Sequence, residues 1–147
     1  MSNYNGNMAK KNAVSLISRI REEANHLLLS ELHKRDVTGL APSHGDLLWA
    51  LYKFKRLTMK ELAEAIYRTK PTVTVLVNKL VSLELIQKQR AAEDSRVTYI
   101  TLTKKGEELQ EVFQEVSDVL NEVVYGDLSS REQVQLEELL EKVLGRF

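Results

Sequence analysis

The stretch LTMKELAEAIYRTKPTVTVLVNKL, residues 57–80, predicts two short helices joined by a tight turn. Thr58 and Glu61 have the spacing of a capping box, in which each side chain satisfies a backbone N–H at the start of a helix. Pro71 has no N–H, so it is best placed in the first turn of the second helix. Together these signals predict a helix-turn-helix unit.

The second of these helices has an apolar face and a polar face. Its apolar residues recur at the spacing i, i+3, i+4 and i+7, which predicts that they face the core. They are Val73, Leu76, Val77 and Leu80. The outer face and first turn then present Thr69, Lys70, Pro71, Thr72, Thr74, Val75, Asn78 and Lys79. Such a helix fits the major groove of B-DNA and can offer amides and side chains to phosphate, the alternative being an ordinary solvent-exposed face.

A β-hairpin is expected next along the chain. Residues 86–90 and 97–102 are strand-like, and the polar loop 91–96 joins them. Within this loop Asp94 and Arg96 flank Ser95, so the carboxylate can hold the guanidinium by charge-assisted hydrogen bonds. An oriented Arg at the tip of a wing suits a narrow, electronegative minor groove. The alternative is a surface ion pair worth less than about 1 kcal/mol.

Charge is distributed unevenly along the chain. Residues 53–106 hold 12 Lys/Arg against 5 Asp/Glu, whereas the remaining residues hold 9 against 16. Cations gather where phosphates must be neutralised, so this pattern predicts double-stranded DNA as a partner. Around the hairpin, phosphate contacts are expected from Lys88, Arg90, Lys104 and Lys105. A winged-helix module that binds protein is the alternative, and the basic segment argues against it.

Amphipathic helices are expected before this segment. Residues 11–35 show helical apolar spacing without Gly or Pro. Ser43 stands in an N-cap position, which predicts a second, more buried helix to about Phe54. Residues 1–12 are polar and rich in Asn, so we expect them to fray.

Further helices are expected after the hairpin. Thr103 is predicted to cap one long helix with an apolar stripe from 109 to 124, and Ser129 with Glu132 predicts a capping box for a last helix. Apolar faces of this length exceed what a lobe of about 60 residues can cover, although the stripe alone could be monomer core. The sequence therefore predicts a homodimer.

Composition excludes several classes of function. The 147 residues are 43% hydrophobic, which suits one folded domain, and they include no Cys, which excludes disulfides and fits the cytoplasm. No apolar stretch is long enough for a membrane helix or a secretory signal. Neither a Gly-rich phosphate loop nor a nucleophile elbow is present, so we expect no enzyme.

Two groups of residues have an alternative interpretation. His26, His33 and His44 could bind metal, but their spacing lacks a ligand motif, and we expect no metal site. The aromatic side chains of Trp49, Tyr52 and Phe54 could line a ligand cleft, although aromatics on an apolar helix are more often core.

Four motifs in one order resemble the MarR family of bacterial and archaeal transcription regulators. They are Leu57-Thr58-Met59-Lys60-Glu61-Leu62-Ala63, Lys70-Pro71-Thr72-Val73-Thr74, Asp94-Ser95-Arg96 and Leu102-Thr103-Lys104-Lys105-Gly106. The resemblance implies a homodimer whose first, fifth and sixth helices interlock above two winged lobes. It also implies repression of nearby genes, often relieved by a small phenolic or other ligand bound between the dimerisation helices and the lobe.

The chain departs from the family pattern at two positions. Glu84 stands where a Gly usually precedes the first wing strand, so it must accept a left-handed conformation at about 1 kcal/mol or use another turn. Val75 stands where a basic residue is frequent. A valine in the groove can contact a thymine methyl; otherwise it packs against the lobe and contacts no base.

The sequence thus predicts a mainly α protein with a small β-hairpin wing, in one MarR-like domain of residues 1–147. We expect a winged helix-turn-helix lobe at about 43–106 and dimerisation helices at about 11–35 and 104–147. The expected function is that of a cytoplasmic homodimeric repressor that binds a near-palindromic operator, has no cofactor and answers to a small-molecule effector of unknown identity.

Overall fold

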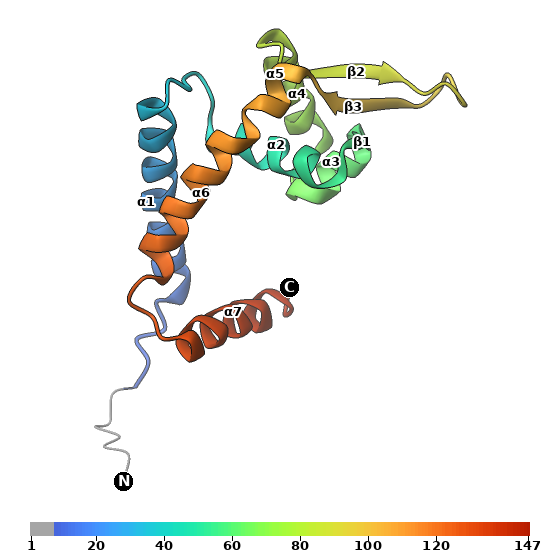
Figure 1. Cartoon of the computed structure of the whole chain (residues 1–147). Coiled ribbons are helices and arrows are strands. Elements are labelled where there is room, and N and C mark those ends of the chain that lie inside the picture. Colours follow the sequence, from blue (N-terminus) through green and yellow to red (C-terminus); the bar gives the residue numbers. More distant parts are fainter. Residues whose placement is uncertain (1–7) are drawn as a thin grey trace.

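The computed structural model describes residues 8–147 and shows a helical chain with one small sheet (Figure 1). The elements in chain order are α1 (Ala13–Lys34), α2 (Pro42–Phe54), β1 (Arg56–Thr58), α3 (Met59–Ile66), α4 (Lys70–Ser82), β2 (Ile86–Arg90), β3 (Thr98–Leu102), α5 (Lys104–Glu108), α6 (Gln110–Tyr125) and α7 (Ser130–Leu144). The predicted fold class is confirmed. Residues 1–7 of the segment expected to fray lie outside the described residues.

The elements form two parts, which we call the lobe and the frame. The lobe comprises residues 42–108, and the frame comprises α1, α6 and α7. In Figure 1 the lobe lies beside the upper end of the crossed helices α1 and α6, with the β2–β3 hairpin projecting outward, while α7 turns away below. No helix within residues 8–147 has the length and apolarity needed to cross a membrane.

The core lies inside the lobe, where α2, α3 and α4 pack with the sheet. Each residue that the spacing of α4 predicts to face inward is buried, which confirms the prediction for Val73, Leu76, Val77 and Leu80. Phe113 and Val116 of α6 join the same core. The first half of the apolar stripe of α6 is therefore interior to one chain, and its end, with Val123 and Val124, is exposed.

Hydrogen bonds fix the helix starts, mostly as predicted. Thr58 with Glu61 and Ser129 with Glu132 form capping boxes. The prediction for Ser43 is wrong: α2 begins at Pro42, because a proline at the first helical position loses no hydrogen bond. The ring of His44 accepts the Ala41 N–H at 2.8 Å instead. Partial burial, with Lys79 nearby, lowers the pKa of His44, so the neutral ring can act as this acceptor.

The sheet has three antiparallel strands in the order β1-β3-β2, where the sequence predicts only the β2–β3 hairpin. β1 pairs Arg56 with Thr101 and Thr58 with Tyr99, and the guanidinium of Arg56 lies 4.3 Å from the centre of the Tyr99 ring. Three residues are too few for strand periodicity to be visible. β3 begins one residue later than expected, at Thr98, because the Val97 N–H donates to the carbonyl of Asp94 within the loop.

The helix expected after Thr103 is divided. Thr103 caps α5 by accepting the Gly106 N–H at 3.1 Å, and α6 begins only after Leu109. Leu109 has φ −73° and ψ −13°, a flattened helical conformation that separates the two segments. The expectation of one continuous helix is therefore wrong at this residue.

A close contact at Gly106 joins the end of α4, the start of β2 and the start of α5; we call it the Gly106 junction. A Cβ on Gly106 would overlap the carbonyl oxygen of Leu85. The Thr103 N–H donates to the same oxygen at 3.0 Å, and the Thr103 hydroxyl donates to the Glu84 carbonyl at 2.6 Å. Glu84 has φ +60°, so it adopts the left-handed conformation, the first of the two alternatives that the sequence left open.

Tyr52 ties α2 to the same junction. Its hydroxyl donates to the carbonyl of Gly106 at 2.8 Å, and burial raises the pKa of the phenol well above its usual range. The side chain is 4% exposed, so the bond is made in a largely water-free place.

We expect Gly106→Ala to lower the free energy of unfolding by about 1 to 3 kcal/mol, because the added methyl group has no room beside Leu85. Urea denaturation monitored by circular dichroism measures this loss. Gly45→Ala is the matched control: its Cβ would meet only Phe113 at 3.4 Å, and alanine favours the α2 helix. Equal stability of the two variants would contradict the steric role of Gly106.

Candidate nucleic-acid interface

The start of α4 is fixed by its cap and by the turn before it. Thr69 is the N-cap, and its hydroxyl accepts the Thr72 N–H at 3.4 Å and lies 3.0 Å from the Thr72 hydroxyl. Pro71 occupies the first turn, as predicted. Tyr67 ends α3 in a left-handed conformation, φ +55°. The turn thus presents the positive end of the α4 dipole to solvent, although Pro71 has no N–H and the cap takes up that of Thr72.

The outer face of α4 is exposed at each predicted position. Exposed residues are Thr69, Lys70, Pro71, Thr72, Thr74, Val75, Asn78 and Lys79. Thr74 is partly engaged, since its hydroxyl donates to the Lys70 carbonyl at 3.0 Å. Val75 is 69% exposed, so it does not pack against the lobe, and its methyl groups face outward.

Further cations lie on the hairpin and beyond it. Lys88 and Arg90 are exposed and stand two residues apart on β2, which places them on one face of the strand. Lys104 is exposed, whereas Lys105 donates to the Leu83 carbonyl at 3.2 Å and so helps to hold the end of α4. Among the predicted phosphate contacts, Lys105 therefore also has a place in the fold.

The wing tip holds Arg96 in one orientation. Oδ1 of Asp94 accepts from the Arg96 backbone N–H at 3.0 Å and from its Nε at 3.1 Å, and Oδ2 accepts from Nη2 at 3.2 Å. These hydrogen bonds lower the pKa of Asp94, so the carboxylate stays charged. The side chain of Arg96 is 89% exposed despite being held, and Ser95 beside it is exposed as well.

Two arginines in or beside the lobe were not singled out from the sequence. Arg68 lies in the turn before α4, where Nη1 donates to the Ile66 carbonyl at 3.2 Å. Arg56 stacks on Tyr99 at the edge of the sheet. The excess of basic residues in 53–106 includes both, but no local motif marks them, because Arg56 stacks on a distant residue and Arg68 bonds to a backbone carbonyl.

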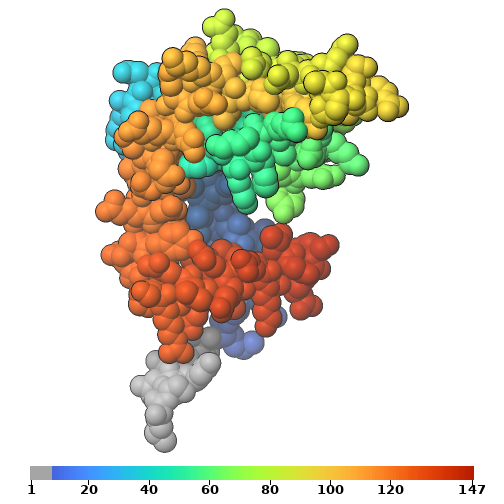
Figure 2. Space-filling view, turned by 45° about the vertical axis from the view of Figure 1, so that its right-hand side comes forward, coloured from blue at the N-terminus to red at the C-terminus, as the bar shows by residue number. Residues whose placement is uncertain are grey.

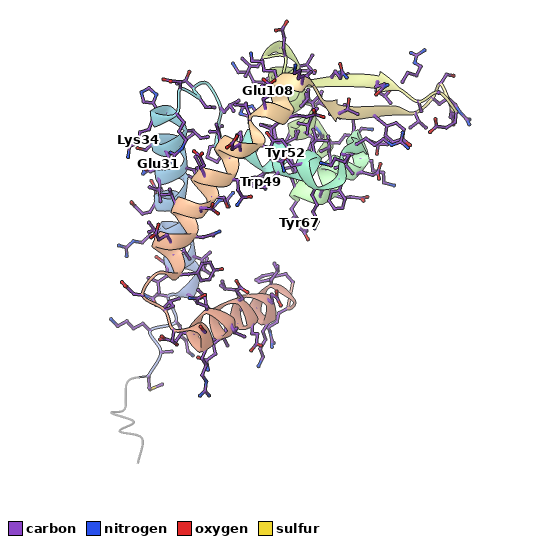
Figure 3. The ribbon with its side chains drawn as sticks, viewed as in Figure 1. Glu31, Lys34, Trp49, Tyr52, Tyr67 and Glu108 are labelled. Carbon is purple, nitrogen blue, oxygen red and sulfur yellow. The ribbon has the colours of Figure 1, made fainter. Side chains whose placement is uncertain are left out.

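The three aromatic residues of α2 have different surroundings. Tyr52 is core, and the ring of Trp49 meets it edge-on at 5.7 Å between centroids. Phe54 is 50% exposed. Trp49, Tyr52 and Phe54 all line a cleft between α1 and the lobe, together with Arg21, Asp46, Tyr67 and Arg68. Figure 3 shows Tyr67 pointing away from the lobe, on the side facing α7. The core and cleft interpretations therefore both apply to this helix.

The histidines do not gather. Within the described residues, no three side chains of His, Asp or Glu are grouped as a metal ion would require. His44 contacts Ala41, as described above, and His26 and His33 are exposed on α1.

The chain is similar to known regulators in sequence. The model of the MarR family matches residues 38–97. The HTH-type transcriptional regulator BilQ of Clostridium symbiosum is 30% identical over 125 residues, which are 84% of this chain and 83% of BilQ. The HTH-type transcriptional regulator MhqR of Bacillus subtilis is 26% identical over 130 residues, 87% of this chain and 86% of MhqR.

The fold is similar to solved structures as well. The S. aureus MepR–DNA complex superposes with a TM-score of 0.80 and 28% identity, covering 94% of this chain and 99% of MepR. A transcriptional regulator from Methanosarcina mazei superposes with a TM-score of 0.79 at 19% identity, covering 93% of this chain and 96% of the regulator, which supports the fold alone.

Proposed function

Because the chain belongs to the MarR family of DNA-binding transcriptional regulators, we propose that it is a homodimeric repressor of a near-palindromic operator. The observation that supports this most directly is the pairing, on one lobe, of an exposed basic and hydroxyl-bearing α4 face with an oriented Arg96 at the wing tip. The helix suits the major groove and the Arg the adjacent minor groove.

The frame supports the homodimer. Much of its apolar surface is exposed, and none of the residues of α7 is buried. The exposed apolar residues of the frame include Val14, Leu16, Ile17, Ile20, Val123, Val124, Val134, Leu139, Leu140, Val143 and Leu144. Figure 2 shows an open hollow between α7 and the lobe, with α1 visible behind it. Apolar surface of this extent is normally covered by a partner, and a second copy has the same faces to offer.

Symmetry then sets the form of the operator. A two-fold dimer presents two identical α4 helices, so its operator is a near-palindrome with half-sites about one helical turn apart. A small-molecule effector can bind in the cleft between α1 and the lobe. There it can change the distance between the two α4 helices of the dimer. Relief of repression by such a ligand completes the proposal.

A protein-interaction module is the second candidate, and DNA binding itself separates the two. Selection of bound sequences from a random duplex pool tests the proposal: we expect one enriched near-palindrome. Two results together would overturn the proposal: no sequence is enriched, and the protein shows no salt-dependent binding to random duplex DNA. The protein-interaction module would then be the better interpretation.

We expect the protein to be a dimer at micromolar concentration, because the frame leaves apolar faces uncovered. Light scattering measures the mass directly. Leu140→Glu should weaken the dimer, because it places a charge on the apolar face of α7, whereas Glu138→Gln on the same helix should not. A stable wild-type monomer would contradict the homodimer.

We expect Lys70→Ala and Lys79→Ala to weaken binding to most DNA sequences, because each lysine neutralises phosphate. Affinity falls as salt rises, and the steepness of this fall on a plot of log affinity against log salt should decrease. The decrease should be about one for every phosphate that a monomer no longer neutralises. Fluorescence anisotropy at several salt concentrations gives the slope. Lys34→Ala is the control, since Lys34 lies at the end of α1 on the side away from the wing (Figure 3). If the slope is unchanged and affinity falls for one operator only, these lysines contact bases rather than phosphates.

We expect Arg96→Ala to cost about 1 to 3 kcal/mol of operator binding and to leave the fold intact, because its side chain is exposed. Asp94→Ala should cause part of the same loss, although removing a negative charge would by itself favour DNA. Glu93→Ala is the matched control: it removes the same charge from the same loop but none of the bonds to Arg96. If Asp94→Ala binds as tightly as Glu93→Ala, Asp94 does not orient Arg96.

A further inference from the structure

One carboxylate, that of Asp46 in α2, lies between two guanidinium groups from distant parts of the chain. Its Oδ2 is 3.5 Å from Nη2 of Arg21 in α1 and 3.8 Å from Nη2 of Arg68 in the turn before α4. We call this set the Asp46 bridge. It connects the frame, the lobe and the start of α4 through a single side chain.

On the lobe side the bridge ends on a firmly held group. Nη1 of Arg68 donates to the carbonyls of Ile66 and Tyr67, which are free acceptors at the end of α3, and the Arg68 backbone N–H donates to Ala63. The next residue, Thr69, is the N-cap of α4. A force on the Arg68 guanidinium is therefore transmitted to the first turn of α4.

On the frame side the bridge ends far from the place where α1 enters the core. Leu32, near the end of α1, is buried in the lobe core, and Leu28 packs against it. Arg21 precedes Leu32 by 11 residues, which corresponds to about 16 Å along a helix. From α1, Arg21 lines the cleft that Trp49 and Asp46 line from the lobe. The bridge thus attaches α1 to the lobe a second time, across an open space.

Among the described residues, Arg21–Asp46 is the one ion pair between α1 and the lobe, since the Arg35–Glu115 pair joins α1 to α6. Its side chains are 58% and 41% exposed, so it adds little to folding stability. A tie of this strength cannot hold the fold, but it can bias the orientation of the lobe relative to the part of α1 that lies outside the core. Its distance from Leu32, where α1 enters the core, gives the bridge leverage over the position of α4.

We propose that Asp46 is a positioning residue that couples the frame to the start of α4 and so sets the spacing between the two half-sites that the dimer accepts. This inference rests on the proposed function, because half-site spacing exists only for a dimer on a two-part operator. It concerns residues outside the DNA-contacting face of α4 and the wing.

The test uses the full-length protein and a set of duplexes built on its selected operator. The set contains the operator itself and versions with one or two base pairs inserted at its centre. The measured quantity is the ratio of the dissociation constants for the inserted and the parent operator. Asp46→Asn should lower this ratio about two- to fivefold, mainly by weakening the parent complex, and leave the salt slope unchanged.

The sign of a second variant separates positioning from simple charge effects. Arg21→Gln removes a positive charge and Asp46→Asn a negative one, so their direct effects on a phosphate backbone are opposite. If both variants act by breaking the Arg21–Asp46 pair, each instead lowers the ratio of the dissociation constants for the inserted and the parent operator. The double variant should then resemble each single variant, because the second change has no tie left to break. Asp46→Glu should restore part of the ratio.

The control is Asp36→Asn. It removes the same charge from an exposed residue with φ +60°, a conformation that Asn accepts, and no ion pair of Asp36 occurs within the described residues. A wild-type protein that binds no operator overturns the proposed function. A wild-type protein that discriminates spacing, with unchanged ratios in Arg21→Gln and in Asp46→Asn, overturns the positioning role alone. If Asp46→Asn does not fold, Arg21→Gln decides, since Arg21 is exposed on α1.

Discussion

The close approach of Gly106 to the Leu85 carbonyl is the constraint on which the rest of the structure depends. Only a residue without Cβ allows this approach, and it brings the end of α4, the first wing strand and the start of α5 to one point. Tyr52 adds α2 to the same point through its bond to the Gly106 carbonyl. The Gly106 junction therefore helps to position α4, the wing and the start of the frame relative to one another, which explains physically why Leu102-Thr103-Lys104-Lys105-Gly106 forms a motif.

The junction also resolves the departure at Glu84. A left-handed Glu costs about 1 kcal/mol relative to Gly, and the hydroxyl of Thr103 offsets part of this cost by donating to the Glu84 carbonyl. Lys105 adds a bond to the carbonyl of Leu83. The turn between α4 and β2 thus keeps its shape without Gly, and the angle of the wing is set by bonds from α5 rather than by the turn residue alone.

Local patterns predicted most of the fold and the candidate interface, because capping boxes and the spacing of Val73 to Leu80 act within one helix. The parts that the sequence did not predict depend on distant partners. β1 is only three residues long and exists through pairing with β3, and the Asp46 bridge joins residues from α1, α2 and the turn before α4. The break between α5 and α6 falls at Leu109, and because this residue is neither Gly nor Pro, the sequence does not predict a break there.

The lobe and the frame differ both in charge and in how well their apolar residues are packed. The basic segment 53–106 coincides with the well-packed lobe, while the acidic remainder includes a frame whose apolar faces are uncovered. In the proposed complex an acidic frame repels phosphate, so the charge pattern favours an approach to DNA with the lobe first although the net charge is zero. In the proposed dimer the frame is completed by a second copy, whereas the lobe packs around its own core, to which Leu32, Phe113 and Val116 of the frame contribute. In this proposal the cleft between α1 and the lobe is the place where a bound effector can change the position of α4.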